Sequence, residues 1–166
     1  MSDFQSMPAP QEGYGAPSRG EKPASIKTAI NIIWALVALS VISSVISLLY
    51  IDDLVALTLE SAGGSGITEE AARGGAVIGV GIGLVIGVLF YALLAFFIGK
   101  GKNWARIVVT VLGGLGVIFG LFGLATSASA QPVVLTVVSV LSLVLTAALL
   151  FFLWKKESSQ WLTGKG

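Results

Sequence analysis

The pattern of the chain is dominated by four long apolar stretches, residues 26–50, 74–98, 104–126 and 133–154. Their interiors carry no charged residue. The two charged residues within these limits, Lys27 and Arg106, lie in the first three residues of their stretches. Each stretch has about 22–25 residues, which at a rise of about 1.5 Å per residue crosses a hydrocarbon core of about 30 Å. The pattern predicts an all-α, polytopic membrane protein built as a bundle of four transmembrane helices.

The connection between the first two stretches also has helical character. Residues 52–61 keep a helical spacing of apolar positions, and the glycine-rich run 63–66 is typical of a helix stop followed by a turn. Thr68 is placed to N-cap the next helix, with Glu69 and Glu70 in its first turn. We therefore expect the first two helices to extend beyond the bilayer as an outer helical hairpin. Its acidic residues lack EF-hand spacing, so we favour a solvated polar cap over a Ca²⁺ site or a docking surface for a basic partner.

The 166 residues leave room for one membrane domain only. Residues 1–24 are rich in Pro, Gly, Ser and Ala and are predicted to form a disordered cytoplasmic tail. Residues 25–156 form the four-helix transmembrane domain, and residues 157–166 a cytoplasmic C-terminal tail. The first apolar stretch is too long for a signal-peptide h-region, which predicts a retained signal anchor.

The distribution of charge predicts the orientation in the membrane. The first predicted outer loop holds one basic residue, Arg73, among five acidic ones, and residues 127–131 carry no charge. The basic residues of the two tails and the middle connection are Arg19, Lys22, Lys27, Lys100, Lys102, Arg106, Lys155, Lys156 and Lys165. The positive-inside rule therefore predicts a multi-pass membrane protein with both termini in the cytoplasm.

Composition removes much of the chemistry that enzymes use. The chain has no Cys and no His, which excludes thiol catalysis, disulfides, imidazole bases and imidazole metal ligands. Only 11% of its residues are charged, against 55% that are hydrophobic, and the acidic ones lie outside the predicted spans. We expect no catalytic residue, no cofactor, no bound metal and no nucleic-acid partner.

Small residues recur at helical spacing in every predicted span. The second span has a fourfold small-xxx-small repeat, the third alternates by three and four, and the first and last carry hydroxyl residues. These residues are Gly75, Gly79, Gly83, Gly87, Gly113, Gly116, Gly120, Gly123, Ser40, Ser43, Ser44, Ser47, Thr136, Ser139, Ser142 and Thr146. We favour packing within the bundle, ahead of an interface with another integral membrane protein or a second copy. A pore lined by Ser, Thr and Gly is least favoured, because no span has an interior charge or a mid-span Pro.

The run 99–107, between the second and third spans, predicts a tight helical corner. Gly99 is suited to end one helix in a left-handed conformation, and Asn103 to N-cap the next. Aromatic and basic side chains here and after the last span are predicted to contact anionic headgroups on the cytoplasmic side. These predicted lipid anchors are Lys100, Lys102, Trp104, Arg106, Trp154, Lys155 and Lys156.

The corner run 99–109 and the closing run 153–159, Leu-Trp-Lys-Lys-Glu-Ser-Ser, resemble a family of small four-span actinobacterial membrane proteins. Those proteins share a Gly-basic-Asn-Trp-Ala-Arg-Ile corner and a Pro/Gly/Tyr-rich tail. The resemblance implies the four-span fold and an actinobacterial source, and hence a location in the bacterial plasma membrane. It implies no catalytic residue. The sequence as a whole predicts a non-catalytic accessory or interaction subunit of a larger membrane complex, with a small channel or transporter as the alternative.

Overall fold

A computed structural model describes residues 21–64, 66–127 and 132–164, and the regular secondary structure in these ranges is entirely helical. The helices are α1 (Ala24–Leu49), α2 (Ile51–Ala62), α3 (Glu69–Gly99), α4 (Asn103–Ser127), α5 (Val133–Trp154) and α6 (Lys156–Thr163). Four of them, α1, α3, α4 and α5, are long and apolar enough to cross a membrane. The predicted all-α fold with four candidate spans is thereby confirmed.

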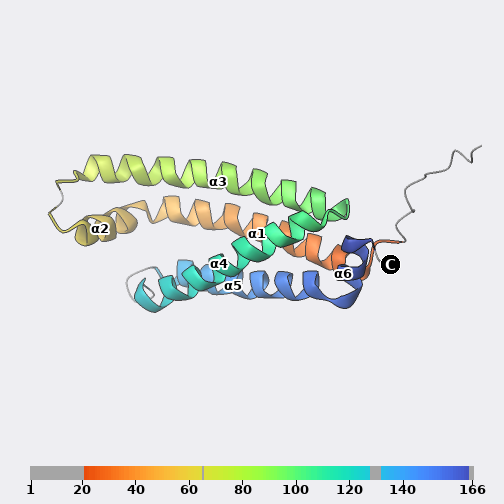
Figure 1. Cartoon of the computed structure of the whole chain (residues 1–166). Coiled ribbons are helices and arrows are strands. Elements are labelled where there is room, and N and C mark those ends of the chain that lie inside the picture. Colours follow the sequence, from red (N-terminus) through yellow and green to blue (C-terminus); the bar gives the residue numbers. More distant parts are fainter. Residues whose placement is uncertain (1–20, 65, 128–131, 165–166) are drawn as a thin grey trace, which may run out of the picture.

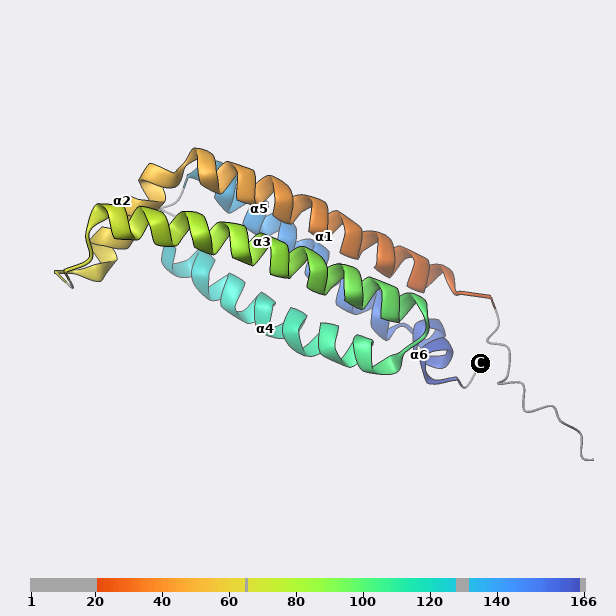
Figure 2. The same ribbon diagram turned by 90° about the horizontal axis from the view of Figure 1, so that it is seen from above.

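The long helices form a bundle in which α1 is central (Figure 1). Helix α1 packs against α3 on one side and α5 on the other, while α4 runs from the end of α3 across to α5 (Figures 1 and 2). The start of α1, the α3–α4 corner and α6 lie at one end of the bundle, which we call the basic end. Helix α2 and the turn into α3 lie at the opposite end, the acidic end. The charged segments that the sequence assigned to one side are therefore grouped at one end of the fold.

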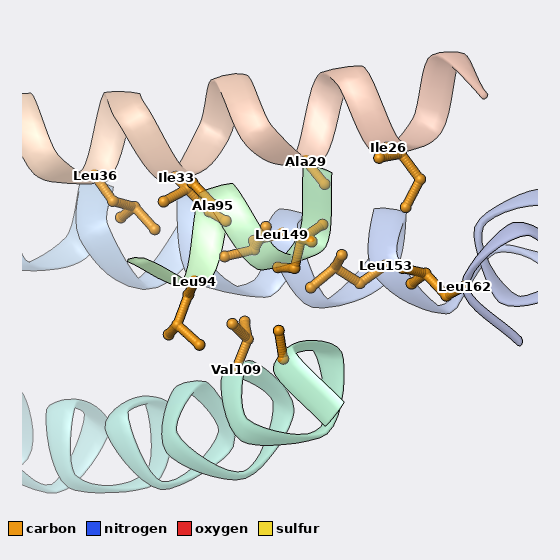
Figure 3. Close-up of a cluster of buried hydrophobic side chains, with 12 residues drawn as sticks. Ile26, Ala29, Ile33, Leu36, Leu94, Ala95, Val109, Leu149, Leu153 and Leu162 are labelled. Atoms are coloured by element: carbon orange, nitrogen blue, oxygen red, sulfur yellow. The ribbon is translucent and has the colours of Figure 1, made fainter. Parts of the chain in front are cut away.

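The bundle is tightly packed only at its basic end. There, buried side chains from α1, α3, α4, α5 and α6 meet in one cluster (Figure 3). Its members are Ile26, Ala29, Ile33, Leu36, Leu94, Ala95, Ile98, Ala105, Val109, Leu149, Leu153 and Leu162. Toward the acidic end, the described residues form only a small second cluster of Ile51, Val55 and Ala72, between α2 and α3. The long helices are thus joined firmly at one end and more loosely at the other.

The outer hairpin has the predicted caps. Gly63 ends α2 in the left-handed conformation, with φ +48°, and the Thr68 hydroxyl accepts a hydrogen bond of 3.2 Å from the backbone N–H of Ala71. The difference from expectation is a break at Tyr50, which separates α2 from α1 instead of letting one helix continue. An ion pair between Arg73 and Asp52 joins the two arms of the hairpin.

At the α3–α4 corner, neither Gly99 nor Asn103 has the role predicted for it. Gly99 is the last residue of α3, and Gly101 instead takes the left-handed conformation, with φ +72°. The backbone N–H of Lys102 donates to the Phe97 carbonyl (3.0 Å) and that of Gly101 to the Ile98 carbonyl (2.9 Å). These two bonds form a Schellman motif, which places the left-handed residue two positions later than expected.

Asn103 does not cap α4 with its side chain. It is the first residue of the helix, and its buried Oδ1 has no hydrogen-bond partner among the described residues. The carbonyl of the preceding Lys102 instead accepts the first bond of the helix, from Ala105 at 3.2 Å. With the short Schellman turn before it, α4 therefore begins at Asn103, one residue earlier than an Asn103 N-cap would predict.

Helical structure also reaches into both segments that were predicted to flank the transmembrane domain. Most of the predicted 157–166 tail is helix α6, which turns back at Lys155 and buries Ser158 and Leu162 against the bundle. The predicted tail 1–24 lies largely outside the described residues, and Ala24 already begins α1. Residues 128–131, in the predicted last loop, also lie outside them.

Candidate functional site

The glycine repeat of α3 is not packed inside the bundle. A Cβ built on any of its four members would have no described heavy atom within 4 Å outside the local helix backbone. These members are Gly75, Gly79, Gly83 and Gly87, which we call the α3 glycine stripe. Large aliphatic side chains beside it are exposed as well, with Ile78 and Ile86 each 61% exposed. The favoured interpretation, packing within the bundle, is therefore wrong for the stripe, because α4 has already left α3 at this level.

The glycines of α4 divide into two kinds. A Cβ on Gly113 would lie 3.4 Å from carbons of Thr146 and Leu150, and one on Gly120 would lie 2.7 Å from a methyl carbon of Leu143. Both positions therefore allow a close approach of α5, as the small-residue spacing predicts. A Cβ on Gly116 or Gly123, by contrast, would have no described heavy atom within 4 Å.

The open glycines of α4 line a groove of about 350 Å³ between α4 and α5. Its walls come from all four long helices and carry several hydroxyl groups. The lining residues are Ser43, Tyr91, Leu112, Gly113, Gly116, Gly120, Gly123, Leu124, Val138, Ser139, Ser142, Leu143 and Thr146. Sequence spacing identified the glycines and most of the hydroxyl residues, but Tyr91 and the convergence of these faces on one groove were missed.

The groove hydroxyls of α5 are bonded within their own helix. Ser139 donates to the Leu135 carbonyl at 2.8 Å, Ser142 to Val138 at 2.9 Å and Thr146 to Ser142 at 2.8 Å. Since a hydroxyl has one proton, these three groups retain only acceptor capacity. The α5 wall therefore presents carbon surface and acceptor oxygen atoms to the groove.

Most of the predicted lipid anchors are exposed at the basic end. Lys100 lies over the Phe96 ring, with Nζ 4.3 Å from its centroid, and Trp104 packs against Phe97 at a tilted angle, with ring centroids 4.9 Å apart. Lys102, Lys155 and Lys156 are exposed too. Their positions suit contact with headgroups, and that contact remains a prediction.

Arg106 does not belong with these exposed cations. Its residue is only 7% exposed, and its guanidinium carbon lies 4.4 Å from the centroid of the Trp154 ring. One terminal nitrogen of Arg106 donates to Ser159 Oγ at 2.9 Å, and the Trp154 indole N–H donates to Thr110 Oγ1 at 2.9 Å. Arg106 is therefore turned into the protein, where it fastens α4 to α5 and α6 instead of facing lipid.

A second polar contact holds α6 at the start of α1. The fully buried Ser158 donates to the Phe152 carbonyl at 2.7 Å, and its oxygen lies 2.8 Å from Ser25 Oγ. Ser25 Oγ also lies 3.4 Å from a carboxylate oxygen of Glu157. Sequence reasoning missed this contact, and the only signal for it was the helical spacing of Ser158 and Leu162, four positions apart.

Acidic side chains are dispersed over the described part of the chain. In the ranges 21–64, 66–127 and 132–164, no three acidic side chains come together as a metal site would require. A comparison with protein families, curated proteins and solved structures finds no match to this chain. The resemblance to the actinobacterial family thus depends on the two sequence runs alone.

Proposed function

We propose that this protein is a non-catalytic integral membrane protein that acts as an accessory or interaction subunit of a larger membrane complex, with α3 as its docking helix. One observation carries the proposal: the α3 glycine stripe faces open space in the isolated chain. Helix association in lipid depends on close van der Waals packing, which glycine at every fourth position permits. The stripe therefore offers a surface suited to another transmembrane helix.

The dimensions of the stripe fit a crossing helix. Gly75 and Gly87 are separated by about 18 Å along α3, since each residue rises about 1.5 Å. Small residues spaced by four favour a right-handed crossing, in which two backbones approach closely over such a length. The partner is another integral membrane protein or a second copy of this chain.

The exposed lysines at the basic end support the orientation proposed for this subunit. Lys100, Lys102, Lys155 and Lys156 all lie at that end, where anionic headgroups of the cytoplasmic leaflet would attract them. The acidic α2–α3 turn would then face the outside of a bacterial plasma membrane. Such anchoring fixes the depth of α3 against its partner.

The orientation leads to a first prediction. A reporter enzyme that is active only outside the cytoplasm should be active when fused after Gly64, in the α2–α3 turn, and silent when fused after Gly166, because the basic segments stay inside. Reporter activity in intact cells measures this, with immunoblots to show equal expression. Activity at Gly166 combined with silence at Gly64 would reverse the orientation.

The docking helix leads to a second prediction. Gly79→Leu should reduce a copurifying partner at least tenfold in mild detergent, because leucine on the stripe holds the partner's backbone away. Gly81→Leu is the matched control. Gly81 is equally open, but it lies about 200° around the helix from Gly79 and likewise from Gly83, so it is not on the stripe. Affinity purification from native membranes with quantitative mass spectrometry gives the ratio. Equal retention in both variants would count against docking through the stripe.

The alternative function, a small channel or transporter, draws support from the Ser, Thr and Gly lining of the groove. Against it stands the cluster at the basic end, where Leu94, Val109 and Leu149 are at most 4% exposed and fill the space between the helices. A path through the bundle would have to open this cluster. Solute flux by the purified protein in liposomes, with no partner present, would favour the alternative.

A further inference from the structure

The groove between α4 and α5 is a distinct surface from the α3 glycine stripe, since none of the four stripe glycines lines it. Along α4 it extends from Leu112 to Leu124, a length of about 18 Å. Helices α3 and α4 pack together near their corner and separate from there toward the acidic end (Figure 1). The groove thus lies within the membrane-spanning part, in the loosely packed half of the bundle.

The groove is closed toward the basic end. Tyr91, Leu112, Gly113 and Thr146 line both the groove and a small void of about 20 Å³ next to it. Beyond that void lie the buried side chains of the main cluster, including Leu149. The groove is therefore a blind cavity and not a passage through the bundle.

The volume and length of the groove fit a single thin chain of carbon atoms. The groove offers about 350 Å³. At about 30 Å³ for a group the size of a water molecule, that is space for roughly a dozen such groups in a row.

The α5 wall of the groove combines carbon surface with hydroxyl groups that have no free proton. The protons of Ser139, Ser142 and Thr146 are already donated within α5, so these groups cannot donate to water. Leu112, Leu124, Val138 and Leu143 add carbon surface. These carbon surfaces, left uncovered, would lose the dispersion contacts that a chain of carbon atoms restores.

We infer that this groove binds one acyl chain of a membrane lipid. A single hydrocarbon chain is thin enough for the cavity, is the main component of the surroundings at this depth, and needs no hydrogen bond from the lining. The inference is independent of the proposed docking of α3. A bound lipid would then be a structural component of the loosely packed half of the bundle.

The test fills the groove without disturbing the fold. A leucine at Gly116 would project into the groove, since a Cβ there meets no described heavy atom within 4 Å. Gly114→Leu is the matched control, because Gly114 is equally free of neighbours but does not line the groove. Helical circular dichroism and a monodisperse elution profile establish that both variants fold.

The probe is phosphatidylglycerol with a diazirine in its acyl chain, incorporated in vesicles with the full-length protein. After irradiation, mass spectrometry maps the adducts. We expect adducts on the groove segments 112–124 and 138–146 to exceed those on the exposed α3 residues Ile78 and Ile82, and to fall at least fivefold in Gly116→Leu but not in Gly114→Leu. Equal adducts in the two variants, or adducts spread evenly over exposed helix faces, would overturn the inference.

Discussion

Replacing Leu153 with alanine is expected to lower the free energy of unfolding by about 3 kcal/mol, because the truncation leaves a cavity in a rigid cluster. Leu153 is fully buried and lies between α1 and α6, close to Ile26, Leu149 and Leu162 (Figure 3). Packing contacts of this kind are a main source of stability for helices in lipid, where burial from water contributes little. The basic end should therefore be the most sensitive part of the bundle.

Leu141→Ala is the control on the same helix. Leu141 is 47% exposed, so its truncation should change stability by less than about 0.5 kcal/mol. Unfolding in mixed micelles of a mild detergent and increasing sodium dodecyl sulfate, followed by circular dichroism, measures both variants. Similar losses at Leu141 and Leu153 would contradict a bundle that is packed mainly at its basic end.

The second large effect is expected at the contact between α4 and α5. Gly113→Leu should destabilise the fold by about 1–3 kcal/mol, the usual cost of overfilling a packed interface. A Cβ at this position already reaches Thr146 and Leu150 at 3.4 Å, so the remaining carbons of leucine must push α5 away. The same unfolding experiment measures this loss.

Its neighbour on α4 supplies the matched comparison. Gly114→Leu adds the same side chain one residue further along, where a Cβ would have no described heavy atom within 4 Å. The expected change is within about 0.5 kcal/mol. If Gly114→Leu were as damaging as Gly113→Leu, the cost would come from placing leucine anywhere on this part of α4, for example through membrane insertion, and not from the α4–α5 contact.

The spans and the outer hairpin could be predicted because their causes are local. Long apolar runs, the left-handed Gly63 and the capping Thr68 act on residues within one or two turns. Helix α6 could not be predicted in the same way, since its eight residues are mostly polar. Its docking depends on Ser25 and Arg106, which lie far from it in the sequence.

The candidate site was predicted in its residues but not in its arrangement. The spacing of Gly79 and Gly83 on α3 resembles that of Gly116 and Gly120 on α4, yet the first pair is open and Gly120 meets α5. The difference arises from the path of α4, which crosses from α3 to α5 (Figure 1), and a repeat within one helix carries no information on that path. Sequence patterns identify small faces, whereas the fold decides what each face meets.

Arg106 illustrates the same limit for charge. Its place near a helix start predicts a position at headgroup depth, but not the direction of a long side chain. The ring of Trp154 and the hydroxyl of Ser159 lie about fifty positions away in the chain and draw the guanidinium inward. A basic residue at a membrane interface is thus assigned to lipid or to protein only once its distant neighbours are known.

The central claim, that α3 is a docking helix, can be tested directly in native membranes. Because the chain has no cysteine, Ile86→Cys introduces a single thiol beside the stripe, where the side chain is exposed and the glycines stay unchanged, and Gly81→Cys introduces a single thiol away from it. Each is labelled with a benzophenone maleimide and irradiated before any detergent is added. Docking through the stripe predicts a discrete adduct of higher mass, with a second copy or another membrane protein, from position 86 and not from position 81. Lipid adducts alone at both positions, or equal protein adducts at both, would contradict it.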